Sequence, residues 1–363
     1  MAATLVSQLM EPSSLRRSSG TLQGLREQLP WPEGKPFRIL SIDGGGIRGI
    51  LPASILAKVE TQYLGGKSAG DYFDLITGTS TGGIIALGLS IGKTAQSILN
   101  LYVNHGKEIF PPLRWDFLNA RKRWRSFQAL QHHRYKAEKL EILLKSVFSE
   151  KTLGEALRRL CVPSFDGFTE VNVFKTPHHS DFRIDWKEHM LTVAMATAAA
   201  PSYFPLYKSG KRFFADGGVW ANNPVMIGLV DALVCYGLER RQVHILSLGT
   251  GDTEIRFTEN QIVHGGLVDW YEIISSAMHL QSQNAMGQAG LLIGRDQLLR
   301  LNAPPMPDDP IALDDYNRSK SELPTIAAQL VSEHGQEMQR RFFFEEAAPY
   351  KAFYGPRALI EAE

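Results

Sequence analysis

Cysteine is scarce in this chain of 363 residues, which contains only Cys161 and Cys235. Two cysteines are too few for a disulfide framework, and neither stands in a CxxC or another metal-ligand spacing. The two adjacent histidine pairs, at 132–133 and 178–179, point to opposite sides of a helix or a strand, so they do not form a ligand set either. We therefore expect a protein of a reducing compartment with no metal site and no cofactor.

Long apolar runs and an excess of charge of one sign are also absent. The longest apolar stretches, at 82–91 and 190–200, are far shorter than the ~20 residues that a membrane span requires. The 39 Lys and Arg against 38 Asp and Glu give a formal net charge of +1, so no overall field attracts nucleic acid or an anionic membrane. The first 28 residues contain no apolar segment of a signal peptide. These features predict a cytoplasmic protein with no DNA or RNA partner and, at most, peripheral contact with a membrane.

The remaining composition is that of a folded protein, because 44% of the residues are apolar and 21% are charged. Strands alternate with helices along the chain, which predicts an α/β fold with a mostly parallel sheet covered on both faces. Strands are predicted over 37–42, 72–77, 171–175, 182–186 and 243–248. Helices are predicted over 50–64, 84–92, 94–110, 136–148, 151–160, 275–290 and 325–341. Three regions are expected: a loose arm over 1–36, a catalytic domain over 37–252, and a C-terminal helical extension over 253–363 that packs on the core.

A G-x-S-x-G sequence occupies residues 78–82, between a predicted buried strand and an apolar helix. Gly78 and Gly82 allow the sharp turn of a nucleophile elbow, which leaves the Ser80 hydroxyl at a helix N-terminus. The free N–H groups of that terminus favour developing negative charge. The sequence therefore predicts Ser80 as a catalytic nucleophile.

A second glycine run, Gly44-Gly45-Gly46-Ile47-Arg48-Gly49, follows the first predicted strand and opens a helix. Two functions compete for it. It satisfies the G-x-G-x-x-G pattern of a dinucleotide site, and its N–H groups are equally suited to an oxyanion hole beside Ser80. The dinucleotide site expects an acidic residue at the end of the second strand, but that strand leads directly into the Ser80 turn. We therefore favour the oxyanion hole.

A serine nucleophile needs a base, because its free hydroxyl is almost un-ionised at neutral pH. Asp216, which follows an apolar run and precedes Gly217 and Gly218, is the natural candidate. The alternative is a Ser, Asp, His triad, in which the histidine would be His244, His264 or His279. His244 lies in a predicted buried strand, so His264 is the histidine that fits best.

Three blocks, at residues 43–49, 78–82 and 216–218, closely resemble in sequence and order the signatures of patatin-like phospholipases. The resemblance extends to 198–205 and 222–224 and spans roughly 37–251. It implies a three-layer α/β/α fold, a Ser/Asp dyad without a catalytic histidine, and lipid acyl hydrolase activity. Carried over by position, the dyad is Ser80 and Asp216. The residues implied around it are Gly45 and Gly46 as main oxyanion donors, Gly44 in the same loop, Arg48 as support for the loop, and Gly78, Gly82, Gly217 and Gly218 as motif glycines.

Residues 110–125 combine aromatic and basic side chains. Such a segment suits an anionic bilayer or a nucleotide, and it equally suits a solvated helix with its tryptophans in the core. The candidate contacts for a ligand or a membrane are Arg121, Arg123, Trp124 and Arg125.

The length, the leading arm and the C-terminal extension also resemble one branch of the family, the bacterial anti-phage effectors. That resemblance implies a phospholipase that a cyclic dinucleotide such as cyclic GMP-AMP switches on, acting at the inner face of the cell membrane, with ligand-driven assembly of several copies as an economical switch. Two other functions stay open: a constitutive lipid or small-ester hydrolase of the same fold, and a non-enzymatic nucleotide-binding protein.

Overall fold

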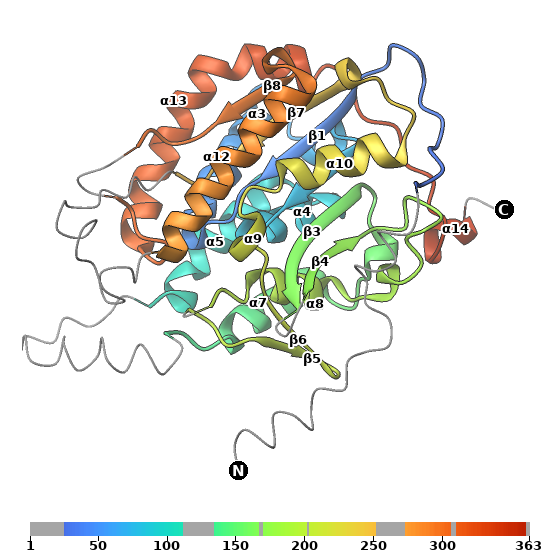
Figure 1. The fold of residues 1–363 in the computed structure, drawn as a ribbon. Helices are drawn as coiled ribbons and strands as arrows, with labels where there is room; N and C mark the ends of the chain where they lie inside the picture. The colour runs from blue at the N-terminus through green and yellow to red at the C-terminus, as the bar shows by residue number, and fades with distance from the viewer. Residues whose placement is uncertain are drawn as a thin grey trace, which may run out of the picture.

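The computed structural model describes residues 25–111, 134–166, 170–201, 203–251, 273–305 and 310–360. Eight strands in these ranges form one sheet in the order β5-β6-β3-β2-β1-β7-β8, and β4 pairs with β3 beside this path (Figure 1). The strands are β1 (Phe37–Ile42), β2 (Leu75–Gly78), β3 (Arg159–Asp166), β4 (Glu170–Lys175), β5 (Tyr207–Ser209), β6 (Arg212–Asp216), β7 (Val243–Leu248) and β8 (Leu298–Leu301).

The sheet is mostly parallel, which confirms the predicted fold class. β1 lies between β2 and β7 and runs parallel to both. β3 is parallel to β2, and β8 is parallel to β7. The antiparallel pairs gather at one side, where β4 and β6 flank β3 and β5 pairs with β6. The carboxyl ends of β1, β2 and β7 therefore meet at one edge of the sheet, the usual place for a ligand or active site in such folds.

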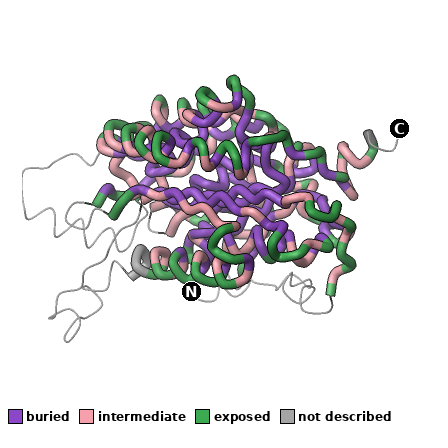
Figure 2. Tube along the Cα trace, turned by 90° about the horizontal axis from the view of Figure 1, so that it is seen from above, coloured by how far each residue is buried: buried purple, intermediate pink, exposed green. Residues whose placement is uncertain are grey.

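Helices cover both faces of this sheet, and Figure 2 shows the buried strands between two helical layers. The α-helices are α3 (Ile50–Tyr63), α4 (Thr81–Ser90), α5 (Ala95–Ile109), α7 (Glu138–Phe148), α8 (Met190–Ala198), α9 (Gly218–Ala221), α10 (Val225–Cys235), α12 (Ile273–Ile293), α13 (Tyr316–Phe342) and α14 (Pro356–Ile360). Short 3₁₀ turns lie at Gly46–Gly49, Ala69–Tyr72, Leu153–Glu155, Asp185–Lys187, Arg240–Gln242 and Arg295–Gln297. No helix in the described ranges is long and apolar enough to cross a membrane.

Strand β1 shows why the two layers form. Its residues are all buried, and successive side chains of a strand point to opposite faces. Phe37 and Ile39 join the apolar cluster that includes α10 and α12. Leu40 and Ile42 join the larger cluster on the other face, which includes α3, α4 and α13. A strand with six buried residues thus anchors both hydrophobic cores.

Helix α13 spans the whole length of the sheet. Its 27 residues correspond to about 40 Å. It begins beside the glycine loop, where the Ile47 N–H donates to the carbonyl oxygen of Leu313 at 2.9 Å. It ends beside the start of β1, where Arg38 Nη1 donates to the Phe342 carbonyl oxygen at 3.1 Å. Gly335 faces Tyr63 of α3 so closely that a Cβ there would collide with the phenol. The helix is therefore packed tightly on α3 between its two ends.

Several predicted elements differ from the structure. The predicted helix over 151–160 is wrong, because only 153–155 form a 3₁₀ turn and β3 begins at Arg159. The predicted strand over 182–186 is also wrong, since 185–187 form another 3₁₀ turn. The strand predicted over 72–77 begins at Leu75. The sequence did not predict β8, which comes from the expected helical extension and adds a strand to the sheet. The division into three regions stays a prediction.

Candidate active site

Ser80 stands at the turn between β2 and α4 with its backbone in a conformation that serine rarely adopts. Its φ is 55° and its ψ −122°, in a region where the Cβ of an L-residue is crowded by the backbone. A Cβ on Gly82 would collide with the Ile42 carbonyl oxygen, and a Cβ on Gly78 would collide with the Gly82 carbonyl oxygen. The two glycines therefore permit the close approach of β1 and α4 that forms this turn.

Helix α8 holds the Ser80 backbone from one side. The Ser80 N–H donates to Thr197 Oγ1 at 2.9 Å, and the Thr197 hydroxyl donates to the carbonyl oxygen of Pro163 at 2.6 Å. Ser80 is 8% exposed. The strained turn is thus fixed by a buried hydrogen-bond chain that leads to β3.

Asp216 is the last residue of β6, and the Ser80 side chain is close enough to lower the pKa of its carboxyl group. Its backbone N–H donates to the Ala199 carbonyl oxygen at 2.9 Å, and the Gly218 N–H donates to its Oδ1 at 2.7 Å. Burial raises the pKa of Asp216 from 3.8 to about 6, although the hydrogen bonds from Ser80 and Gly218 oppose this rise. A carboxylate with such a pKa is ionised at neutral pH and still basic enough to accept a proton.

The glycine loop lies next to this pair. The Gly44 N–H donates to the Asn222 carbonyl oxygen at 3.0 Å, so it is not free to bind an oxyanion. Among the described residues, no partner is found for the N–H groups of Gly45 and Gly46. The predicted set of oxyanion donors therefore narrows to these two amides.

Segments distant in the sequence hold the glycine loop in place. A Cβ on Gly45 would collide with Thr250, whose hydroxyl donates to the Gly44 carbonyl oxygen at 2.7 Å. Gly46 has a positive φ of 57° and faces the carbonyl oxygen of Leu313. The segment after β7 thus contacts the loop at Gly45, and the segment before α13 contacts it at Gly46.

Two charged residues at the ends of the glycine loop, Asp43 and Arg48, connect it to the C-terminal part of the chain. Arg48 is buried, and its Nη1 donates to the Ile311 carbonyl oxygen at 3.5 Å. The Asp43 carboxylate accepts hydrogen bonds from Nη1 and Nη2 of Arg300, at 3.0 and 2.6 Å. The bidentate pair joins the start of the loop to β8.

The remaining residues predicted for the site are a motif glycine, Gly217, and the histidines considered as alternative bases. A Cβ on Gly217 would collide with the Pro163 carbonyl oxygen, so this glycine lets β6 approach β3 closely. His244 pairs with Arg38 in the register of β1 and β7, near the strand ends remote from the glycine loop. His279 lies on α12, where its Nε2 contacts Gln283. The alternative base His264 and the basic cluster, Arg121, Arg123, Trp124 and Arg125, lie outside the described residues.

Sequence reasoning assigned no role to five residues that hold Ser80 or the glycine loop in place: Thr197, Asn222, Thr250, Arg300 and Leu313. Thr250 had a local signal, because it stands between two glycines directly after a strand and so at the same sheet edge as the other loops. The Asn222 carbonyl and the Leu313 carbonyl act through the backbone, which residue types do not reveal.

Comparisons with known proteins identify the family of this chain. The family model described as patatin-like phospholipase matches residues 40–229. The chain belongs to the patatin-like phospholipase family. A relative from Escherichia coli (strain TW11681) named cGAMP-activated phospholipase is 33% identical over 346 residues, which cover 86% of this chain and 94% of the relative.

A relative of the same name from Vibrio cholerae is 39% identical over 203 residues, which cover 53% of this chain and 56% of that protein. Among solved structures, human GIVD cytosolic phospholipase A2 has a TM-score of 0.40 at 12% identity, over 84% of this chain and 60% of that one. The family assignment makes this protein a phospholipase, a hydrolase of carboxylic esters.

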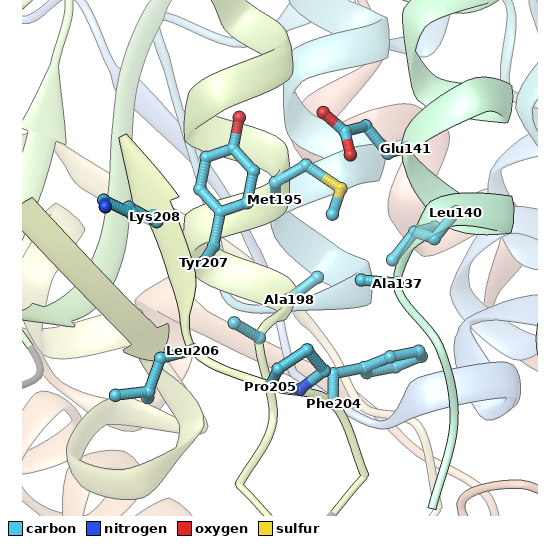
Figure 3. A pocket seen from close by; sticks show the side chains of 11 residues that line it. Ala137, Leu140, Glu141, Met195, Ala198, Phe204, Pro205, Leu206, Tyr207 and Lys208 are labelled. Carbon is cyan, nitrogen blue, oxygen red and sulfur yellow. The ribbon is translucent and has the colours of Figure 1, made fainter. Parts of the chain in front are cut away.

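This phospholipase has a cavity of about 260 Å³ between α7, α8 and the segment before β6 (Figure 3). Met195 and Ala198 of α8 line it, together with Leu140 of α7 and Phe204. Thr197, in contrast, faces the sheet, where it holds Ser80 and Pro163. The cavity therefore lies on a different side of α8 from the nucleophile.

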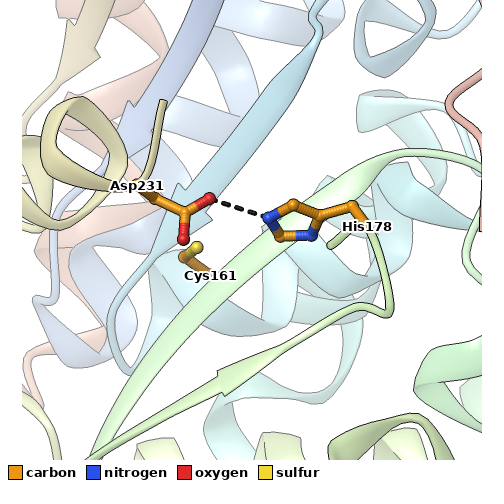
Figure 4. A group of neighbouring side chains, drawn as sticks. All are labelled: Cys161, His178 and Asp231. Carbon is orange, nitrogen blue, oxygen red and sulfur yellow. Dashed lines mark hydrogen bonds and ion pairs between the residues drawn. The ribbon is translucent and has the colours of Figure 1, made fainter. Parts of the chain in front are cut away.

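A buried group at the other end of β3 consists of Cys161, His178 and Asp231, whose polar atoms lie within 4.8 Å of one another (Figure 4). Both carboxylate oxygens of Asp231 already have partners: Lys175 Nζ lies 2.5 Å from Oδ1, and His178 Nε2 lies 2.7 Å from Oδ2. Burial raises the pKa of the Cys161 thiol well above its usual value, which keeps it protonated. Since the Lys175 ammonium already balances the carboxylate, we assign no metal to this group.

The Lys175–Asp231 pair is expected to contribute strongly to stability. Lys175→Met leaves the Asp231 charge buried without its ammonium partner, and we expect the free energy of unfolding to fall by about 3 to 5 kcal/mol. Urea unfolding measures this change. The matched control is Lys151→Met, because the Lys151 side chain is 49% exposed beside Glu155. Its loss is expected to change stability by about 0.5 kcal/mol or less, since solvent screens that pair. If Lys175→Met and Lys151→Met lowered the free energy of unfolding equally, the Lys175 ammonium would not be needed to balance the buried Asp231 charge.

Gly82→Ala is expected to disrupt the nucleophile turn. The added Cβ would meet backbone atoms of Ile42 and Asp43, so we expect a loss of about 1 to 3 kcal/mol of unfolding free energy together with loss of esterase activity. Gly287→Ala is the control, because nothing lies within 4 Å of its Cβ in α12 and alanine favours a helix by roughly 0.5–1 kcal/mol. Thermal unfolding and ester hydrolysis measure both effects, and a fully active Gly82→Ala enzyme would show that the close approach is dispensable.

Proposed function

We propose that this patatin-like phospholipase hydrolyses the acyl esters of membrane phospholipids with Ser80 as nucleophile and Asp216 as base, and that a cyclic dinucleotide switches the activity on. The observation that carries the catalytic part is the strained turn at Ser80, with its φ of 55°, next to the buried carboxyl group of Asp216, whose pKa of about 6 the Ser80 side chain influences. The amides of Gly45 and Gly46, which stand beside this pair, support the same chemistry.

The proposed reaction begins with attack of Ser80 Oγ on the ester carbonyl carbon while its proton moves to the Asp216 carboxylate. The negative charge on the carbonyl oxygen is held by the N–H groups of Gly45 and Gly46, and the helix N-terminus at Thr81 adds a favourable field. When the tetrahedral intermediate collapses, the leaving alcohol oxygen takes the proton from Asp216, and an acyl-Ser80 ester remains. Water then attacks this ester with Asp216 again as base, which releases the fatty acid and restores Ser80.

The regulatory part is supported by the relatives named cGAMP-activated phospholipase, one of which this chain matches over nearly its whole length. In this proposal the enzyme is a cytoplasmic effector of bacterial anti-phage defence that acts at the inner face of the membrane. A constitutive hydrolase of the same fold is the alternative. Fatty-acid release from phospholipid vesicles, measured with and without a panel of cyclic dinucleotides, separates the two, because a constitutive enzyme responds to none of them.

A nucleotide site on the glycine loop itself is disfavoured. The Gly44 N–H is bonded to the Asn222 carbonyl oxygen and the Ile47 N–H to the Leu313 carbonyl oxygen, which leaves fewer amides of the loop for a pyrophosphate. Covalent labelling of Ser80 by a fluorophosphonate tests this further, because the serine of a mere binding protein would not react.

Ser80→Ala and Asp216→Asn are each expected to lower phospholipid hydrolysis by about 10³-fold or more, since each removes one half of a unit that acts together. Fatty-acid release from vesicles with cyclic GMP-AMP present measures the loss, and thermal unfolding checks the fold. His264→Ala is the matched control and is expected to retain turnover. If Asp216→Asn kept near-normal turnover and His264→Ala lost it, the base would be His264, as in the alternative triad.

The activity is expected to rise with pH around the pKa of Asp216. The base form is the ionised carboxylate, and a pKa of about 6 makes it roughly one tenth ionised at pH 5 and about nine tenths at pH 7. We therefore expect kcat/KM for a soluble ester to increase with a midpoint near pH 6 and to level off above pH 7. A profile already flat from pH 4.5 upward would contradict a base in this environment.

A further inference from the structure

A second cavity, of about 440 Å³, lies at the edge of the sheet opposite to Ser80. It is bounded by the chain before β1, by His244 at the start of β7, and by the C-terminal end of α13. Its volume is within the range of about 300–1,000 Å³ that small-molecule sites occupy. None of its lining residues belongs to the catalytic site described above.

Three arginines and two glutamates contribute charge to the lining of this cavity. The arginines are Arg241, Arg340 and Arg341. Arg241 pairs with Glu239, and Arg341 pairs with Glu337, at 2.6 Å each, whereas Arg340 is exposed and no ion pair of it is found within the described residues. Its guanidinium group is therefore available to an anion in the cavity, and guanidinium groups suit phosphate oxygens especially well.

A histidine in the wall also lacks a partner. His244 Nδ1 is buried without a hydrogen bond. Burial and the nearby charges of Arg341 and Arg38 lower the pKa of His244, so the neutral imidazole is the favoured form. A buried ring nitrogen that borders a cavity can be satisfied by a polar group of a ligand.

Phe344 adds a flat apolar surface to the same cavity. Its side chain is 51% exposed. The Arg38 guanidinium lies over the ring at 4.7 Å, and Arg38 Nη1 donates to the Phe342 and Glu345 carbonyl oxygens at 3.1 and 2.6 Å. The chain that carries Phe344 is thus fixed by a buried arginine, while the ring stays accessible for stacking with a base.

We propose that this cavity binds a cyclic dinucleotide, with a phosphodiester against Arg340 and Arg341 and a base stacked on Phe344. The carboxylate of Glu33, which also lines the cavity, is an acceptor for the N–H donors on the edge of a purine such as guanine. The proposal rests on the regulated function proposed above, for which it supplies the site.

Three elements connect this cavity to the glycine loop. Helix α13 ends at the cavity, and Leu313, just before its first turn, accepts the Ile47 N–H. Strand β7 starts at the cavity, and Thr250, just after its end, bonds to the Gly44 carbonyl oxygen. Strand β1 carries Arg38 and leads directly into Asp43. A ligand that shifts α13 or the strand ends therefore changes the support of the oxyanion donors, which gives it a route to the catalytic rate.

Titration calorimetry of the full-length protein with cyclic GMP-AMP tests the site. Phe344→Ala and Arg340→Ala are expected to weaken binding about tenfold or more, because stacking and a charge-assisted phosphate contact are lost. Phe344→Tyr keeps the ring and is expected to bind within about threefold of the wild-type protein. Arg183→Ala makes the same change of net charge as Arg340→Ala on an exposed loop far from either site, and it is expected to change neither binding nor hydrolysis.

The outcomes separate the site from the regulation. Both substituted side chains are exposed, and thermal unfolding checks that the variants are folded. If the wild-type protein binds cyclic GMP-AMP and is activated by it, while folded Phe344→Ala and Arg340→Ala bind equally well, the cavity is not the site. If the wild-type protein hydrolyses phospholipid but neither binds nor responds to a cyclic dinucleotide, the regulated function itself is wrong.

Discussion

The close approach of β1, β2 and α4 around Ser80 is the constraint on which the rest of the site depends. Ser80 has a positive φ, a backbone conformation that costs of order 1–3 kcal/mol at a residue with a Cβ. The surrounding contacts maintain it: Gly82 against the Ile42 carbonyl oxygen, and the Thr197 hydroxyl on the Ser80 N–H. The turn brings the Ser80 side chain close to Asp216 and to Gly44 of the glycine loop.

The electrostatics of the dyad follow from its burial. Asp216 receives hydrogen bonds but has no cation among the groups that shift its pKa, so desolvation prevails and the carboxylate becomes a stronger base. Asp231, which is equally buried, is bonded to Lys175 and His178, and its pKa is held well below the usual range. The same residue type therefore has opposite pKa shifts at the end of β6 and on helix α10. The difference is the presence of a neighbouring ammonium group.

The sequence could predict those elements whose structure is determined by residues close together in the chain. Strands β1 and β7 have the predicted bounds because each is a short, mostly apolar run whose residues are all buried in β1 and, except for His244, in β7. The elbow and the glycine loop were recognisable because their glycines are needed for close approach. Residues 151–160 were assigned to a helix because their local pattern does not reveal that β3 begins at Arg159 in pairing with β2. Thr197, Leu313 and Arg300 meet the site only through the tertiary fold, so no local pattern could assign them.

The bond between Asp43 and Arg300 has a consequence for how the protein is made. The Ser80 turn and the glycine loop are synthesised early, whereas Arg300 and Leu313 follow more than two hundred residues later along the chain. A nascent chain therefore contains Ser80 long before the residues that support the glycine loop exist. The order of synthesis itself delays assembly of the candidate site until the segment 300–313 has been made.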